Sequence, residues 1–144
     1  DVLRIVRSDL VNRNIETQLA LATSLPLVEG DRVQLQQVLM NLIINGAEAM
    51  AAGGDERSLR LHTRQGEGGV LLEVTDGGPG IRENDLERIF DPFVTTKRDG
   101  LGLGLAVCRT IIQAHHGRLW ATDNDGCGAT LHMFLPALVN SSDG

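Results

Sequence analysis

The sequence predicts an α+β fold, a two-layer sandwich in which three helices cover one face of a mixed five-stranded sheet. Three observations carry this prediction. Apolar residues recur at helical spacing in three segments, five short runs have strand character, and turn-forming residues separate them. The 144 residues, 42% of them apolar, are enough for one domain with a hydrophobic core and too few to expect two.

The first half of the chain predicts a helix, a strand and a long helix. Residues 1–12 place apolar side chains at helical spacing, and residues 15–22 alternate like a half-buried strand. Asp31 followed three residues later by Gln34 resembles a capping box, so a long helix should begin here. That helix is expected to end near Ala52, before two glycines.

The second half predicts a hairpin, a helix and two further strands. Residues 58–64 and 70–75 should form an antiparallel hairpin around a glycine-rich turn of five residues. Residues 103–114 are apolar at helical spacing. The last two strands are expected at 118–122 and 129–135.

Composition excludes several classes of protein. One domain is expected over residues 1–136, with a polar, frayed tail over 137–144. The net charge of -6 and only four aromatic residues argue against a nucleic-acid partner. No apolar run could cross a bilayer and no secretory signal is present, so we expect a soluble, cytoplasmic segment without membrane contact. The two cysteines lie in unrelated contexts, which favours reduced thiols.

The long helix carries a polar face that is almost uncharged. Gln34, Gln37, Asn41, Asn45 and Glu48 recur at steps of three and four, so they share one side. Asparagine is a poor residue inside a helix because its amide competes for backbone partners. Two asparagines one turn apart therefore favour a binding site. When the helix is considered without the other motifs, an ordinary solvated face is the alternative.

Two glycine-rich segments favour contact with a ligand. Asp76 ends an apolar strand and precedes Gly-Gly-Pro-Gly, which lets backbone approach a flat ligand, although a plain surface turn explains this segment equally well alone. Gly100, Gly102 and Gly104 open the next helix, whose free amides and dipole favour phosphate. The spacing fits neither a dinucleotide fingerprint nor a P-loop, because Leu105 stands where a glycine or lysine would be needed.

In order and spacing, four segments resemble the ATP-binding domain of sensor histidine kinases. They are residues 37–45, 76–81, 90–97 and 100–105. The superfamily (GHKL, Bergerat fold) also holds gyrase, the large heat-shock chaperone and the MutL proteins. The resemblance covers residues 1–136 and looks closest to sensor kinases that carry PAS domains.

The resemblance implies roles for particular residues. Asn45 would supply an oxygen to Mg²⁺, and Asn41 would support the metal and the phosphates. Hydrolysing relatives have Glu at position 41, so Asn there favours phosphoryl transfer over hydrolysis. Asp76 would accept a hydrogen bond from the adenine amino group, which favours ATP over GTP. In a mobile lid over residues 90–101, Lys97 would be the phosphate cation; a solvated loop is the alternative.

The implied site residues form one set. The ATP-binding residues are Asn41, Asn45, Glu48, Asp76, Gly78, Gly80, Ile81, Phe93, Thr95, Thr96, Lys97, Gly100, Leu101, Gly102, Leu103, Gly104, Leu105 and Thr130. Asn41, Asn45 and Lys97 are the catalytic candidates, and Asn45 is the candidate Mg²⁺ ligand. Thr130 resembles the threonine of a final family box that lies beside the adenine-binding aspartate, although a plain strand residue is the alternative.

The expected function is that of a protein-histidine kinase catalytic domain. It would bind Mg-ATP and donate the γ-phosphate to a histidine on a separate dimerisation domain, with a response regulator receiver domain as further partner. None of His62, His115, His116 and His132 precedes an acidic residue as the family's acceptor does, and the two at the helix end would suit positive charge there. A nucleotide-dependent interaction module without phosphotransfer and an anti-sigma-factor-like serine kinase stay open as alternatives.

Overall fold

The fold is a five-stranded sheet covered on one face by helices. The computed structural model describes residues 7, 10–52, 58–91, 104–124 and 128–138. The strands are β1 (Glu16–Ala20), β2 (Ser58–Gly66), β3 (Gly69–Thr75), β4 (Arg118–Asp123) and β5 (Ala129–Pro136). Their order is β1-β2-β3-β5-β4, and β1 pairs with β2 in parallel while the other pairs are antiparallel. The predicted mixed five-stranded sheet is confirmed.

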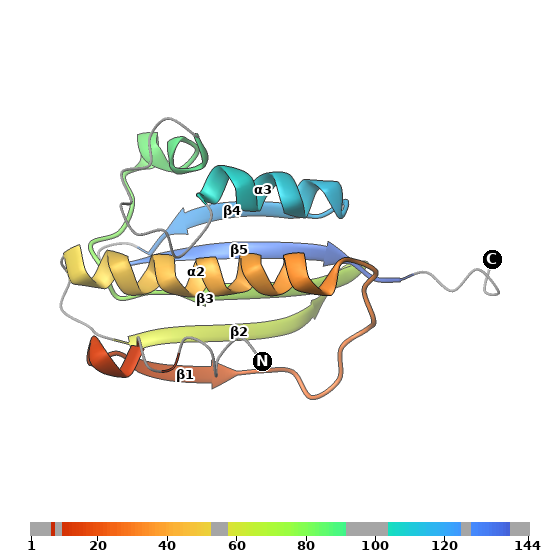
Figure 1. Cartoon of the computed structure of the whole chain (residues 1–144), viewed down its shortest axis with the longest axis horizontal. Coiled ribbons are helices and arrows are strands. Elements are labelled where there is room, and N and C mark those ends of the chain that lie inside the picture. Colours follow the sequence, from red (N-terminus) through yellow and green to blue (C-terminus); the bar gives the residue numbers. More distant parts are fainter. Residues whose placement is uncertain (1–6, 8–9, 53–57, 92–103, 125–127, 139–144) are drawn as a thin grey trace.

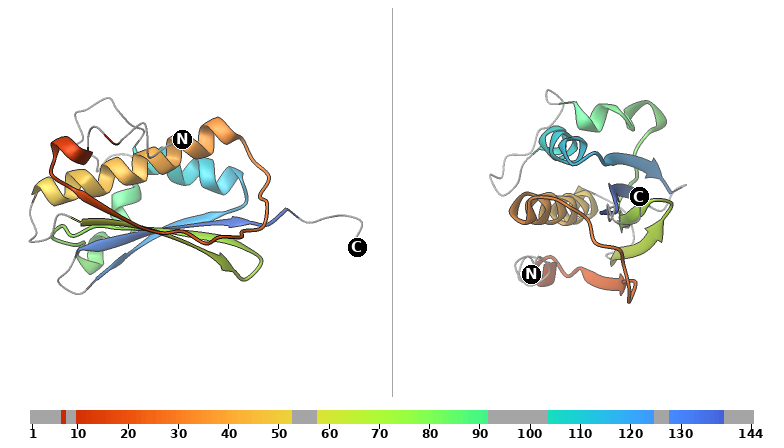
Figure 2. Two further views of the ribbon diagram at one scale, coloured as in Figure 1. Left: turned by 90° about the horizontal axis from the view of Figure 1, so that it is seen from below. Right: turned by 90° about the vertical axis from the view of Figure 1, so that its right-hand side faces the viewer.

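Helices α2 (Arg32–Ala52) and α3 (Leu105–Ala114) lie side by side on one face of the sheet (Figures 1 and 2). Residues 10–12 form the last part of a third helix. Asn14, which takes a φ of 58°, then turns the chain toward β1. Two short 3-10 turns, η1 (Glu83–Asp85) and η2 (Arg88–Phe90), precede α3. No described helix is both long and apolar enough to span a membrane.

The core lies between the helices and the sheet. Val38, Leu42 and Ile43 of α2 are fully buried, as are Leu59 of β2 and Ile112 of α3. Each such side chain contributes about 1.5–3 kcal/mol by leaving water. This burial fixes which side of α2 faces the sheet and therefore fixes where its polar residues lie.

The ends of α2 agree with the sequence prediction, and the hairpin turn does not. The Gln34 backbone N–H donates to Asp31 Oδ1 at 3.1 Å, and the helix ends at Ala52. The hairpin turn is shorter than the predicted five residues, because β2 continues to Gly66 and β3 resumes at Gly69. Gly68 takes a φ of 81°, which permits a two-residue turn.

The first two residues of the predicted tail form backbone hydrogen bonds. The Ala137 N–H donates to the Gly68 carbonyl at 2.9 Å, and the Leu138 N–H donates to the Leu27 carbonyl at 2.6 Å. Residues 137 and 138 are thus held to the hairpin turn and to the segment before α2. Residues 139–144 lie outside the described part of the chain.

His115 joins the end of α3 to the start of α2. Its Nδ1 lies 2.8 Å from the Ile111 carbonyl, and its Nε2 accepts the Asp31 N–H at 2.9 Å. These two partners require the tautomer with the proton on Nδ1, because a ring nitrogen that accepts cannot carry a proton. His115 therefore links the end of α3 to the start of α2 through its two ring nitrogens.

Candidate functional site

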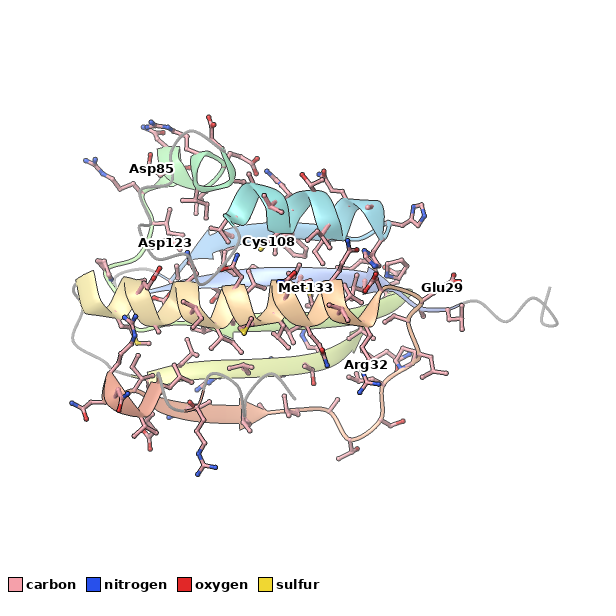
Figure 3. The ribbon with its side chains drawn as sticks, in the orientation of Figure 1. Glu29, Arg32, Asp85, Cys108, Asp123 and Met133 are labelled. Carbon is pink, nitrogen blue, oxygen red and sulfur yellow. The ribbon has the colours of Figure 1, made fainter. Side chains whose placement is uncertain are left out.

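The polar side of α2 meets α3 at Asn41. This side chain is only 8% exposed, and its Nδ2 donates to Cys108 Sγ at 3.1 Å (Figure 3). Asn45 and Glu48, one and two turns further along, are half-buried, whereas Gln37 at the other end is exposed. The structure therefore divides the predicted polar face, and its second half forms a buried corner between the two helices.

Cys108 is a partner of Asn41 that the sequence did not reveal. Burial raises the pKa of its thiol, an effect that the Asn41 hydrogen bond partly opposes, so the sulfur is a neutral, buried acceptor. Because 67 residues separate the two side chains, only the packing of α3 on α2 brings them together. The prediction of a reduced thiol holds for Cys108, and Cys127 lies outside the described residues.

Asp76 stands at the end of β3 as a buried carboxylate, 8% exposed. Its Oδ1 accepts the Gly78 N–H at 2.8 Å and the Ala129 N–H at 3.4 Å. Burial raises the pKa of Asp76, and the two backbone hydrogen bonds partly offset that rise. One carboxylate oxygen is thus fixed by backbone amides, which orients the whole carboxyl group.

Glycines let the Asp76 loop pack directly against α2. A Cβ on Gly46 would lie 3.5 Å from Asp76 Cβ, and a Cβ on Gly78 would lie 2.8 Å from the Ala49 carbonyl oxygen. Gly46 follows Asn45, so the Asp76 loop and the asparagine side of α2 are neighbours in space. The structure therefore brings together Asp76, Gly78 and the second half of the predicted polar face.

Asp123 holds the far end of this loop and was not among the predicted site residues. Its Oδ1 accepts the Ile81 N–H at 2.9 Å, next to Gly80, whose φ is 90° (Figure 3). The turn that contains Asp123 is itself closed by the Asn124 N–H, which donates to the Gly128 carbonyl at 2.9 Å. The sequence placed Asp123 just after the strand expected at 118–122 and gave no signal of this contact.

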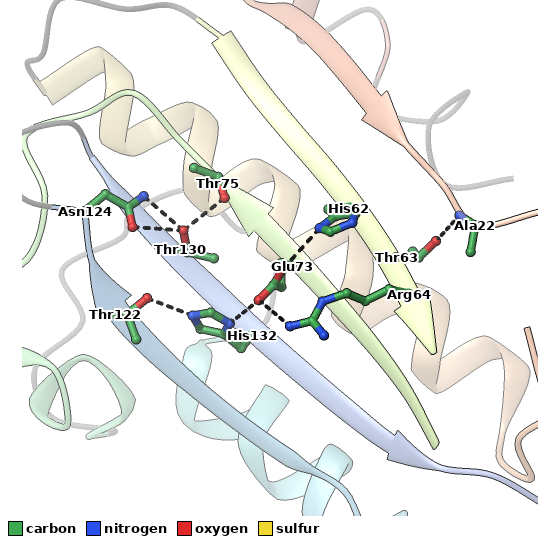
Figure 4. A network of polar contacts seen from close by, with 10 residues as sticks. All are labelled: Ala22, His62, Thr63, Arg64, Glu73, Thr75, Thr122, Asn124, Thr130 and His132. Atoms are coloured by element: carbon green, nitrogen blue, oxygen red, sulfur yellow. Dashed lines mark hydrogen bonds and ion pairs between the residues drawn. The ribbon is translucent and has the colours of Figure 1, made fainter. Parts of the chain in front are cut away.

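Thr130 does not reach Asp76 as the resemblance implied. Its hydroxyl lies 2.9 Å from Thr75 Oγ1 and accepts the Asn124 Nδ2–H at 2.9 Å (Figure 4). Strand alternation explains the difference, because Thr130 points to the sheet face away from the helices. The residue of this box that contacts the carboxylate is Ala129, through its backbone N–H.

The start of α3 closes the site on its remaining side. Gly104 is the N-cap residue of the helix, and among the described residues a Cβ added to it would meet nothing within 4 Å. Leu105 is half-buried. The remaining predicted residues lie outside the described part of the chain: Phe93, Thr95, Thr96, Lys97, Gly100, Leu101, Gly102 and Leu103.

Arg109 anchors the segment that precedes the predicted lid. Its Nη1 and Nη2 donate to the two Glu87 carboxylate oxygens at 2.9 and 3.2 Å, and its Cζ lies 4.4 Å from the centre of the buried Phe90 ring. The Arg109 hydrogen bonds lower the pKa of Glu87. Arg109 thus ties η2, which ends at the first residue of the predicted lid, to α3.

Comparison with known families identifies the class of protein. Residues 30–139 match the family described as histidine kinase-, DNA gyrase B-, and HSP90-like ATPase, and the chain belongs to this family. Among curated relatives, the sensor protein FixL of Bradyrhizobium diazoefficiens is 40% identical over 125 residues, which are 87% of this chain and 25% of FixL. The transport sensor protein DctS of Rhodobacter capsulatus is 45% identical over 115 residues, 78% of this chain and 17% of DctS.

Solved structures give the same result at the level of the fold. The catalytic domain of histidine kinase ThkA has a TM-score of 0.80 at 32% identity, covering 94% of this chain and 89% of that one. ThkA is also known in complex with the response regulator protein TrrA, with a TM-score of 0.79 at 29% identity over 95% of this chain and 38% of that one. Full-length ShkA in complex with AMPPNP has a TM-score of 0.77 at 30% identity, and the match covers 96% of this chain and 29% of ShkA. This chain thus spans a quarter or less of the sensor proteins FixL and DctS and nearly all of an isolated kinase catalytic domain.

Proposed function

We propose that this chain is the catalytic ATP-binding domain of a sensor histidine kinase, which donates the γ-phosphate of Mg-ATP to a histidine on a separate dimerisation domain. The observation that carries the proposal is the buried, backbone-oriented carboxylate of Asp76 beside the Asn45 turn of α2. A fixed acceptor at this depth suits the amino group of adenine. It would reject guanine, whose carbonyl at that place is a second acceptor.

The donor set on α2 fits a magnesium ion. Among the described residues, no group of three His, Cys, Asp or Glu side chains could hold a metal. An amide oxygen from the half-buried Asn45 would instead contribute one ligand to a mostly hydrated ion, which suits Mg²⁺ bound chiefly through phosphates and water. When bound, the ion would neutralise phosphate charge, and Asn41 would hold the corner behind it through Cys108.

Asn41 supports phosphoryl transfer over hydrolysis. An amide at this position cannot take a proton from water, whereas an imidazole acceptor needs positioning and charge neutralisation more than proton removal. The start of α3, at Gly104 and Leu105, would add backbone amides for the phosphates. We infer that Lys97 supplies the remaining cation.

The partners follow from the same proposal. The acceptor would be a dimerisation and histidine phosphotransfer domain elsewhere in the parent protein, and the phosphate would pass to a response regulator receiver domain. A cytoplasmic location follows from the use of ATP as donor. A PAS-type sensory domain in the parent protein stays a prediction from the sequence.

Transfer of labelled γ-phosphate tests the proposal. The chain is mixed with a dimerisation domain and labelled ATP, and Asn45→Ala should reduce the rate at least a hundredfold because a metal ligand is lost. Gln37→Ala, an exposed change on the same helix, should leave the rate unchanged. Equal rates for Asn45→Ala and the unchanged chain would remove Asn45 from its role.

The nature of the phosphorylated product separates the alternatives. Phosphohistidine is lost in acid, so an acid-stable product would indicate a serine kinase. Saturable ATP binding with no labelled acceptor would indicate a nucleotide-dependent interaction module.

A further inference from the structure

The outer face of the sheet, opposite α2 and α3, carries side chains in three rows that cross strands β2, β3, β5 and β4. Figure 4 shows some members of these rows. Strand register defines the rows. The arginine row is Arg64, Leu71, Phe134 and Arg118; the histidine row is His62, Glu73, His132 and Trp120; the threonine row is Arg60, Thr75, Thr130 and Thr122.

Arginines outnumber acidic residues in these rows. Glu73 is the one acidic residue of the three rows, and its two oxygens lie 3.3 Å from His62 Nδ1 and 2.8 Å from His132 Nδ1 (Figure 4). Arg60 and Arg118 form no ion pair with any described residue, and Arg64 reaches Glu73 only at 3.9 Å. The three rows therefore carry a net positive charge on a chain whose net charge is -6.

Aromatic rings lie between these arginines. Trp120 stacks on His132 with ring centres 5.0 Å apart, and the Arg118 guanidinium lies 5.4 Å from the centres of both the Trp120 and Phe134 rings. Trp120 and Phe134 are half-buried and so keep part of their surface in water. Arginine and aromatic side chains are enriched at the centres of protein interfaces, where they contribute most of the binding energy.

We propose that the arginine row is a docking site for an extended acidic segment of a partner protein, with the pattern acidic-x-apolar-x-acidic. Arg64 and Arg118 stand at the two ends of the row, three strand spacings or about 14 Å apart. In an extended peptide, residues i and i+4 lie about 13 Å apart on one side, and residue i+2 lies between them. The two carboxylates would meet the arginines, and the apolar side chain would lie on Phe134.

Titration with a synthetic peptide tests this site. The probe is acetyl-Ser-Glu-Ser-Leu-Ser-Glu-Ser-amide at low ionic strength without nucleotide, and the signal is the fluorescence of Trp120, the single tryptophan of the chain. Isothermal calorimetry provides a second readout. Saturable binding is expected, and a glutamine version of the peptide or one with adjacent glutamates should bind at least fivefold more weakly.

Matched variants locate the site on the sheet. Arg118→Gln and Arg64→Gln should each weaken binding at least fivefold, whereas Arg32→Gln, an equally exposed change on α2, should not. Asp76→Asn should bind the peptide like the unchanged chain, because the nucleotide site lies elsewhere. Thermal unfolding of each variant establishes that the fold is intact.

Three results would overturn the proposal. The first is absence of binding by calorimetry, or equal binding of the glutamine peptide. The second is a DNA duplex that binds tenfold more tightly than the peptide through Arg118, which would assign the face to nucleic acid. The third is a dimer that forms without peptide and is lost in Arg118→Gln, which would assign the face to a second copy of the chain.

Discussion

At the scale of the residue, Asp76 carries a conflict between stability and binding. Its carboxylate is buried where ionisation is costly, and burial raises its pKa, yet a charged, oriented acceptor is what an adenine amino group needs. The two backbone hydrogen bonds to Oδ1 can be kept by an asparagine oxygen. Stability and nucleotide binding should therefore respond in opposite directions to substitution.

We expect Asp76→Asn to unfold at a higher temperature than the unchanged chain at pH 7 and to bind ATP tenfold to a hundredfold more weakly, since its amide N–H would face another donor. Calorimetry with ATP and thermal unfolding measure the two effects. Asp123→Asn, which keeps an oxygen that can accept the Ile81 N–H, should change neither the unfolding temperature nor ATP binding by much.

The pH dependence of this difference has a definite sign. The folded-state pKa of Asp76 is raised above the ordinary value, so its contribution to stability is present at low pH and is lost as pH rises through the folded-state pKa. The stability advantage of Asp76→Asn should vanish near about pH 3, where both states are protonated, and grow toward neutral pH. A constant advantage across this range would contradict burial of the charge as its cause.

Gly128→Ala should destabilise the protein by about 3 kcal/mol. Gly128 has a φ of 88°, and an added Cβ would collide with the Asp76 carbonyl oxygen. Gly68→Ala is the matched control, because Gly68 has a φ of 81° and nothing within 4 Å, so only about 1 kcal/mol of backbone strain is expected. Urea unfolding measures both, and equal losses would exclude the collision as a cause.

At the scale of the element, α3 organises the site through contacts on three sides. Cys108 bonds to Asn41 of α2, Arg109 holds η2, and His115 bonds to the start of α2. A hydropathy pattern describes each of these helix positions only as polar or apolar, so it does not predict these contacts. The helix therefore acts as a link between the asparagine corner, the segment before the lid and the capped end of α2.

Arg109→Ala should lower the free energy of unfolding by about 1 kcal/mol and make the segment around Phe90 exchange its amide hydrogens faster. The Glu87 side chain is 74% exposed, so water screens its share of the interaction. The pKa of Glu87 is lowered, so its contribution is present at neutral pH and is lost as pH falls through the folded-state pKa. The free energy of unfolding of Glu87→Gln should therefore be lower than that of the unchanged chain at pH 7, and the two should be equal under acid conditions.

At the scale of the whole molecule, the sandwich places Asn41, Asn45 and the Asp76 loop, which belong to the proposed nucleotide site, on the helix side of the sheet. The opposite face keeps a separate, positively charged surface. If both proposals hold, two anionic partners would bind opposite faces of the sheet without competing for the same side chains. A ligand that binds only the folded domain should also raise its thermal stability.

ATP with Mg²⁺ at about one hundred times its dissociation constant should stabilise the chain by about 2.7 kcal/mol. For a domain of this size the midpoint of thermal unfolding should rise by roughly 10 °C. GTP at the same concentration should give little or no rise, and Asp76→Asn should reduce the stabilisation by ATP to about 0.4–1.4 kcal/mol. An equal rise with GTP would contradict the role of Asp76 in base recognition.

The sequence by itself determined the α+β class, the strands and helices, the Asp31 cap and the membership of a nucleotide-binding family. Periodicity, turn residues and short motifs are local properties, so they are readable without coordinates. The tertiary structure alone decided that Asn41 bonds to Cys108, that Asp123 holds Ile81, and that Ala129 rather than Thr130 meets Asp76. Each of these depends on helix packing or strand register between distant segments, where a shift of one residue turns a side chain to the other face.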